Sequence, residues 1–177
     1  MYEVELKLRV EHQDLRERLA TIDAKPVGTV TQVDTYYNHL TRNFAETDEA
    51  LRIRRETTDS EKKAKLTYKG PLVDADSKTR EELETSVGDE EIMAAILESV
   101  GFDPAATVEK TRERFRCGEY TVTLDSVTGL GEFIEVETEA EKIDPAREGA
   151  VELLERLDLD PDQGIRRSYL GLLLDAE

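Results

Sequence analysis

The feature that most constrains this fold is a set of short segments in which apolar and charged side chains alternate. In residues 1–10, MYEVELKLRV, the apolar side chains occupy the even positions, whereas the odd positions from Glu3 to Arg9 are all charged. Because successive side chains of a β-strand point to opposite faces, this alternation predicts a strand with one apolar face and one charged face.

The rest of the chain predicts seven further strands and four helices, separated by turn residues. The strands are expected at 27–37, 50–56, 64–69, 77–87, 106–117, 119–127 and 131–139. The helices are expected over about thirteen residues from Glu11, closed by Pro26 and Gly28, and at 89–100, 145–157 and 164–174. Strands that are grouped, rather than strictly alternating with helices, predict an α+β fold with mainly antiparallel pairing. The absence of a linker or repeat predicts one domain over 1–177.

The charged faces carry both signs, and the signs are sorted by segment. Arg and Lys gather in 50–56, 64–69 and 106–117, whereas pairs of Glu occur in the first and last predicted strands. For any one strand, a face turned to water is the simpler interpretation. For the set, closure into a barrel with its charged face inward better explains why so acidic a chain concentrates bases on its strands. The apolar face would then pack against the helices.

The charge balance limits the possible partners. The chain has 24 Lys and Arg against 41 Asp and Glu, a net charge of −17. This balance argues against nonspecific binding to nucleic acid or membranes, which requires basic surface. Acids spread through periodic segments indicate a surface adapted to high salt, and we hypothesise a halophilic source. The N-terminus lacks signal-peptide character, and no membrane-spanning run occurs, so a cytoplasmic protein is predicted.

A barrel interior with both signs of charge suits one class of ligand. Arg and Lys on several walls match the oxygens of a polyphosphate. Spaced carboxylates suit hard cations such as Mg²⁺ or Mn²⁺, and the sequence does not distinguish these two metals. The lone Cys117 and the distant His12 and His39 do not indicate a zinc site or a nucleophile.

Several motifs, in order along the chain, resemble the CYTH superfamily, the triphosphate tunnel metalloenzymes. They are EVELK at 3–7, QVDTYY at 32–37, EALRIRRE at 49–56, LTYKGP at 66–71, TREELET at 79–85, VEKTRERF at 108–115, LDSVTGLGEFIEVE at 124–137 and SYLGLLL at 168–174. The stretch from Asp34 to Glu56 and the YKGP step are most similar to class IV adenylyl cyclases. The resemblance implies an eight-stranded antiparallel barrel that encloses a tunnel.

The resemblance also implies roles for individual residues. The metal ligands would be Glu3, Glu5, Glu135 and Glu137. The phosphate-binding residues would be Lys7, Arg52, Arg54, Lys69, Arg80, Lys110 and Arg112. The residues with catalytic roles would be Glu5, Lys7, Asp125 and Glu135. Further tunnel-lining residues would be Lys65, Glu82, Glu84 and Arg114. Arg166 and Arg167 either reach the tunnel mouth or lie on the surface. Homodimerisation is compatible with the resemblance, but no residue pattern indicates it.

Three functions fit these residues. In the first, ATP is cyclised to cyclic AMP and pyrophosphate. In the second, the same site hydrolyses the terminal phosphate of thiamine triphosphate or inorganic triphosphate. In the third, the barrel is a non-catalytic module that binds polyphosphate or nucleotide. Tyr36, Tyr37 and Phe44 could pack on an adenine ring, although aromatic residues in such a stretch more often belong to a core.

Overall fold

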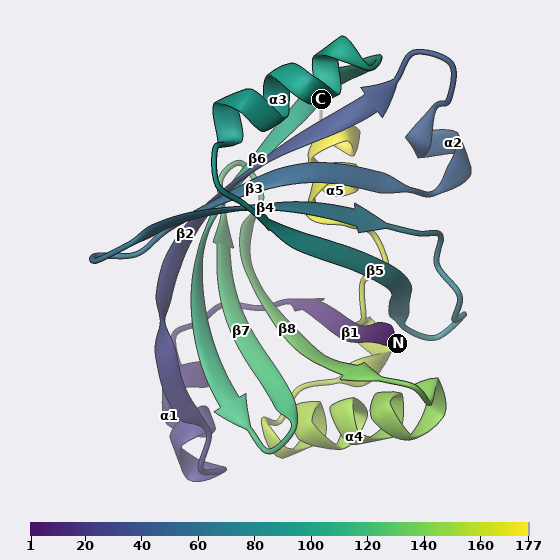
Figure 1. Cartoon of the computed structure of the whole chain (residues 1–177). Helices are drawn as coiled ribbons and strands as arrows, with labels where there is room; N and C mark the ends of the chain where they lie inside the picture. Colours follow the sequence, from purple (N-terminus) through teal and green to yellow (C-terminus); the bar gives the residue numbers. More distant parts are fainter. Residues whose placement is uncertain (177) are drawn as a thin grey trace.

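The eight predicted strands form one closed antiparallel barrel (Figure 1). The computed structural model describes residues 1–176, and residue 177 of the predicted domain lies outside this range. The strands are β1 (Tyr2–Arg9), β2 (Lys25–His39), β3 (Ala50–Thr57), β4 (Lys62–Lys69), β5 (Lys78–Val87), β6 (Phe102–Cys117), β7 (Tyr120–Val127) and β8 (Gly131–Ala140). Around the barrel they follow the order β1-β5-β4-β3-β2-β6-β7-β8, and β8 pairs with β1. The fold class inferred from the alternation is therefore confirmed.

Five α-helices and a 3-10 turn accompany the barrel in the described residues. They are α1 (Leu15–Thr21), α2 (Phe44–Thr47), α3 (Glu90–Ser99), α4 (Ile143–Arg156), η1 (Pro161–Gln163) and α5 (Tyr169–Asp175). None of these helices has the length and apolar character that crossing a membrane requires.

The apolar face of the barrel packs outward, against helices. The largest apolar cluster joins outward side chains of β1, β7 and β8 to α1 and α4, and includes Leu6, Val136 and Leu154. A second cluster packs α3 over β2 and β3 through Leu97, Ile53 and Tyr37. Figure 1 shows α4 beneath the lower strands and α3 across the upper ones. Because helices bury the apolar face, the charged face is left for the barrel interior.

The segment before β2 differs from its prediction. The predicted helix of about thirteen residues from Glu11 is only seven residues long and begins at Leu15. The backbone N–H of His12 instead donates to Glu132 Oε2 at 2.7 Å, which ties this segment to β8. The helix ends at Thr21 with Ile22 as its C-cap, and Asp23 then has a φ of 56°, which a continuing helix does not allow. Pro26 and Gly28, expected to close the helix, lie at a bulge within β2.

Two other elements also differ from prediction. The four-residue α2 was missed; it begins where the Asn43 side chain accepts a hydrogen bond from the N–H of Ala45. The last helix begins at Tyr169 and not at Gly164, because residues before it run along the barrel and Ile165 N–H donates to the carbonyl of Lys7 at 2.7 Å. Ser168 then caps the helix, accepting from Gly171 N–H at 3.0 Å.

Candidate active site in the barrel

The barrel encloses one cavity of about 960 Å³, and every strand contributes to its lining. Most of the sequence-predicted site residues line it. The lining residues among them are Glu3, Glu5, Arg52, Arg54, Lys65, Lys69, Arg80, Glu82, Glu84, Lys110, Arg112, Arg114, Glu135 and Glu137. Antiparallel pairing explains this convergence, because inward-pointing positions on neighbouring strands lie side by side.

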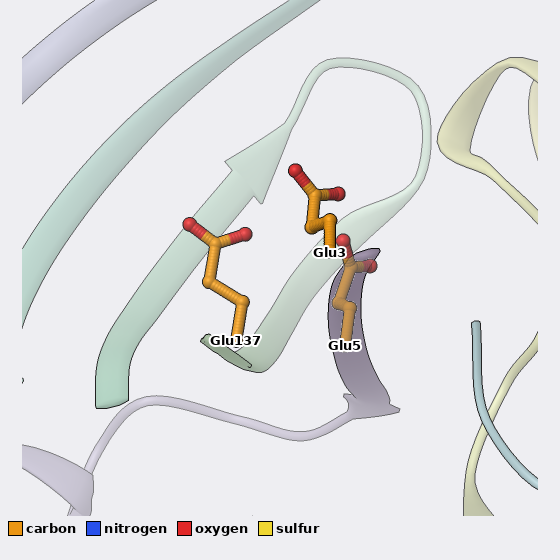
Figure 2. A group of neighbouring side chains, drawn as sticks. All are labelled: Glu3, Glu5 and Glu137. Carbon is orange, nitrogen blue, oxygen red and sulfur yellow. The ribbon is translucent and has the colours of Figure 1, made fainter. Parts of the chain in front are cut away.

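Three carboxylates come together where β1 meets β8. Glu3, Glu5 and Glu137 each offer an oxygen, and these oxygens all lie within 4.8 Å of one another. Figure 2 shows the three side chains converging on one region from their separate backbone positions. The β1–β8 register explains the group, because it pairs Glu5 directly with Glu137.

The electrostatics of this group favour a divalent cation. Burial and the neighbouring Glu3 raise the pKa of Glu137 to about 8, since its negative charge is poorly balanced by the protein. Three oxygen donors with excess negative charge are the ligand set that Mg²⁺ or Mn²⁺ takes in proteins. A bound divalent cation would supply Lewis-acid stabilisation of negative charge on phosphate oxygens.

Glu135, the fourth predicted metal ligand, is placed differently. Its Oε2 accepts from the Arg112 guanidinium at 2.9 Å, and its Oε1 lies 3.7 Å from Lys7 Nζ. The pKa of Glu135 is held well below its usual range because Arg112 and Lys7 outweigh the effect of burial. Glu135 is therefore adjacent to the three-carboxylate group but paired with bases.

Two arginines of β3 share a carboxylate that the sequence analysis missed. The Arg54 guanidinium donates two hydrogen bonds to Asp34, at 2.7 and 2.8 Å, and Arg52 lies 3.6 Å from the same carboxylate. Asp34 is fully buried, and its pKa is lowered because these arginines outweigh its desolvation. The alternation of side chains along β2 could have identified Asp34, since it lies on the same face of this strand as Gln32 and Tyr36.

Two lysines form ion pairs with members of the three-carboxylate group. Lys69 Nζ donates to Glu3 Oε1 at 2.9 Å and also lies 3.2 Å from Glu82. Lys78, which was not among the predicted residues, donates to Glu5 Oε1 at 3.0 Å. It precedes the motif TREELET by one residue and has the same parity as Arg80, so the alternation rule would have found it.

Arg80 is engaged with loops at the rim of the cavity. Its guanidinium donates to the carbonyls of Asp48 and Gly70, at 2.9 and 2.7 Å, and to the Asp48 carboxylate at 3.0 Å. The predicted phosphate-binding residue thus also joins the turn before β3 to the turn after β4.

Asp125 holds Arg112 in place. The Arg112 guanidinium donates to both oxygens of Asp125, at 2.8 and 2.7 Å, and Tyr169 Oη donates to Oδ2 at 2.7 Å. Asp125 is completely buried. Because both oxygens already accept hydrogen bonds, this arrangement supports an anchoring role for Asp125 rather than a role as a base or metal ligand.

The other end of the lining is also ion-paired. Lys65 donates to Glu84 at 3.1 Å, and Arg114 donates to Glu56 at 2.9 Å. Gln32 donates from Nε2 to the same Glu56 oxygen at 2.6 Å. Because each pair joins one base to one carboxylate, these pairs add no net charge to this end of the cavity.

The lining of the cavity also includes apolar and aromatic residues, and we call this set the annex. Its lining residues are Tyr36, Tyr37, Phe44, Leu72, Ala105, Ala106, Leu170 and Leu174, with the amides of Asn38 and Asn43 beside them. Arg166 and Arg167 also line the cavity, which agrees with the first of the two placements considered for them. The cavity therefore combines a charged part with a part suited to an uncharged ring.

The barrel is charged on its inside and apolar on its outside, which is the architecture that the motifs implied. The CYTH domain model matches residues 1–169. A Methanocaldococcus jannaschii protein, provisionally named an adenylate cyclase, is 38% identical over 176 residues, covering 97% of this chain and 98% of that protein. The chain belongs to the CYTH family.

Solved structures agree with this assignment. A Pyrococcus horikoshii protein superposes with a TM-score of 0.90 at 38% identity, covering 99% of both chains. A Hippeastrum protein, described as a candidate adenylyl cyclase with a dominant triphosphatase activity, has a TM-score of 0.71 at 17% identity and covers 99% of this chain and 96% of its own. At that identity, the second similarity shows the fold alone.

Proposed function

We propose that this chain is a metal-dependent enzyme acting on a triphosphate, and that ATP, cyclised to cyclic AMP and pyrophosphate, is its favoured substrate. The observation that carries the proposal is the composition of one cavity. It holds three convergent carboxylates, bases from at least four strands, and the apolar annex. Inorganic triphosphate would use only the charged part, whereas a nucleoside triphosphate would use both.

The bases would bind and orient the phosphate chain. Arg52, Arg54 and Arg112 present planar guanidinium groups, which match pairs of phosphate oxygens, and Lys69 and Lys110 add point charges. Arg52, Arg54, Lys110 and Arg112 are buried, and the side chain of Lys69 is 12% exposed, so charge interactions there are stronger than in bulk water. Catalysis would then consist mainly of positioning and charge stabilisation, as is usual for phosphoryl transfer.

In the cyclisation, the ribose 3′ oxygen bonds to the α-phosphorus. The bond from that phosphorus to the α–β bridging oxygen breaks, and pyrophosphate leaves with the electron pair. The 3′ hydroxyl proton passes to a carboxylate of the site. Of the predicted catalytic residues, Glu5 and Glu135 are the candidates for this role, whereas Asp125 already accepts three hydrogen bonds from Arg112 and Tyr169. Lys7, beside Glu135, would neutralise charge that develops on the phosphates.

A triphosphatase is the second candidate. Its supporting observation is the Hippeastrum protein, which shares the fold and is described by that activity. Among the described residues, the charged part of the cavity contains no group that distinguishes attack on the α-phosphorus from attack on the γ-phosphorus. The related M. jannaschii protein's name and the annex together favour the cyclase.

A product assay tests the proposal. The purified protein would receive ATP, inorganic triphosphate or thiamine triphosphate, each with Mg²⁺ or Mn²⁺, in low salt and in molar KCl. Cyclic AMP with pyrophosphate is the expected result from ATP. Orthophosphate without cyclic AMP would assign the chain to the triphosphatases. The variant Glu5→Gln should lose turnover by orders of magnitude; if only binding occurs and E5Q binds triphosphate as well as wild type, the binding module is correct.

The annex can be tested by filling it. Ala106→Phe would place a ring in the annex and should raise KM for ATP at least about tenfold, with little effect on inorganic triphosphate. Thr107→Phe, on the exposed opposite face of β6, is the matched control and should leave both unchanged. Equal effects of A106F on both substrates would contradict a role for the annex in binding an organic group.

A further inference from the structure

We infer that Tyr169 of α5 is a positioning residue, which holds Lys7, Lys110 and, through Asp125, Arg112 in the geometry that binds the phosphate chain. The inference rests on the proposed function in taking these three bases as phosphate ligands. It concerns a residue that is contributed by a helix outside the eight strands and to which no role was assigned from the sequence.

Both lysines approach the Tyr169 ring. Lys7 Nζ lies 3.9 Å from the ring centroid, and Lys110 Nζ lies 5.0 Å from it. Both distances are within the range in which the electron-rich face of an aromatic ring attracts a cation. The two ammonium groups come from β1 and β6, so a single side chain of α5 contacts charges on separate walls.

The other partners of these ammonium groups leave most of their N–H donors without a direct hydrogen bond. The nearest carboxylates are Glu135 for Lys7 and Asp34 for Lys110, and each ammonium–carboxylate distance is 3.7 Å, beyond a direct hydrogen bond. Lys7 Nζ makes one hydrogen bond, to the carbonyl of Arg167 at 3.0 Å, from the segment that leads into α5. Of the two lysines, Lys110 is among the described residues that line the cavity, where its N–H donors face the space for a ligand.

Burial explains why these lysines need such support. Lys7 is 1% exposed and Lys110 is 4% exposed. Desolvation, with the nearby charge of Lys78, lowers the pKa of Lys7 to about 8, and desolvation with Arg112 lowers the pKa of Lys110. An aromatic face stabilises a buried cation without neutralising it or occupying its donors, as a carboxylate would.

The hydroxyl of Tyr169 extends this support to a third base. Tyr169 Oη donates to Asp125 Oδ2 at 2.7 Å, and both oxygens of Asp125 accept hydrogen bonds from the Arg112 guanidinium. The ring and the hydroxyl thus act on different bases. Replacing the hydroxyl alone should disturb Arg112 while leaving the contacts of the two lysines intact.

Tyr169 is itself held firmly. It is 5% exposed, and its ring packs edge-to-face on Phe133 with a centroid distance of 5.0 Å. As the first residue of α5, it directly follows Ser168, whose side chain caps the helix. A purely structural role would require only that an apolar group fill this space beside Val108 and Val127, which a leucine could also do.

The test compares Tyr169→Leu and Tyr169→Phe. The probe is inorganic triphosphate, titrated calorimetrically in EDTA, so that binding depends on the bases and no turnover occurs. We expect Y169L to weaken binding about tenfold, from the loss of the cation–π contacts, and Y169F to weaken it less than about threefold. In the activity assay, Y169L should raise KM more than it lowers kcat.

Leu173→Ala is the matched control, since Leu173 packs on the same apolar cluster as Tyr169 and is not among the described residues that line the cavity. It should bind triphosphate like wild type. Binding by Y169L within twofold of wild type, or an equal loss in L173A, would overturn the inference and leave the proposed function standing. A wild-type protein that binds no triphosphate and turns over no substrate would overturn the proposed function and, with it, the inference.

A double-mutant cycle with Lys110→Met guards against loss of folding in Y169L. Because the ring is proposed to act on Lys110, Y169L should cost less affinity in the K110M background than in wild type, whereas Y169F, which keeps the ring, should cost about the same in both backgrounds. A fully additive loss for Y169L would show that the ring does not act through Lys110 and would overturn the inference.

Discussion

Lys78 donates a hydrogen bond from Nζ to Oε1 of Glu5 at 3.0 Å, across the junction of β5 and β1. The pair joins a carboxylate of the candidate metal group to a base that faces the same cavity. Burial alone would lower the pKa of Lys78, but the charge of Glu5 reverses this and raises it. Lys78 is therefore charged at neutral pH and moderates the negative charge of Glu3, Glu5 and Glu137.

Replacing Lys78 should separate metal binding from phosphate binding. In Lys78→Met, the carboxylates lose a nearby positive charge, so Mn²⁺ should bind as tightly as in wild type or more tightly. Triphosphate should bind about tenfold or more weakly, because one cation is lost in a buried site. Calorimetric titrations with MnCl₂ and with inorganic triphosphate measure the two effects separately. Lys62→Met, on an exposed lysine, is the control, and parallel losses of both affinities in K78M would contradict the assignment.

Glu137→Gln should strongly weaken the stabilisation of the protein by divalent cations. Ligand binding to the native state raises the melting temperature, so Mg²⁺ or Mn²⁺ should raise that of the wild-type protein. E137Q removes one of the three carboxylates and should respond much less. In EDTA, the same variant should melt higher than wild type, since repulsion from Glu3 is relieved, and ~1 kcal/mol corresponds to ~2–4 °C for a chain of this size. Glu141→Gln, on an exposed residue beyond β8, should resemble wild type in both conditions.

The metal-free protein should lose stability as the pH rises from about 5 to 8. The pKa of Glu137 is about 8 in the folded protein and 4.5 in the reference state, so in this interval the native state retains a proton that the unfolded chain has lost. The free energy of unfolding then falls with pH, by at most ~1.4 kcal/mol per pH unit for one group. Urea unfolding in EDTA at several pH values measures this slope. A slope as steep in E137Q as in wild type would show that another group is responsible.

Asp34→Asn should destabilise the free protein severely. It would leave Arg54, Arg52 and Lys110 around a neutral amide, and removing one partner of a buried ion pair costs about 3–5 kcal/mol. Inorganic triphosphate supplies negative charge to the same bases and should restore more stability to D34N than it adds to wild type. Urea unfolding with and without triphosphate tests both statements. Asp59→Asn, in the exposed turn between β3 and β4, should change neither; a loss below about 1 kcal/mol in D34N would contradict the prediction.

The strands and their inward faces could be predicted because alternation is local. The face on which a side chain such as Glu5 or Arg54 lies depends only on its position along its own strand. The strand pattern alone therefore assigned most of the charged cavity-lining residues to the inward face. Asp34 and Lys78 obey the same rule, although Asp34 was given no role within the motif QVDTYY and Lys78 lies one residue before the motif TREELET. The helix boundaries were less predictable, since contacts such as that of His12 with Glu132 depend on the closed barrel.

The grouping of the carboxylates required the barrel register. Glu5 lies opposite Glu137 because β1 and β8 close the barrel, and no local pattern states which strands meet there. The pairing of Glu135 with Lys7 and Arg112 follows from the same closure. The role of Tyr169 could not be predicted for a related reason. The motif SYLGLLL has the pattern of an ordinary terminal helix, and only the fold directs Tyr169, the first residue of α5, toward Lys7 and Asp125.

The acidity of the chain leads to a last prediction. With 41 acidic against 24 basic residues, and with many of the bases lining the cavity, like charges dominate the outer surface. Raising KCl from about 0.1 M to 1 M shortens the screening length from ~10 Å to ~3 Å, which weakens repulsion between exposed carboxylates more than attraction within buried pairs. The melting temperature should therefore rise in molar KCl. Replacing the exposed Glu91 and Glu98 of α3 with Gln should reduce this dependence on salt, whereas a melting temperature that fell with added KCl would contradict the hypothesis of adaptation to high salt.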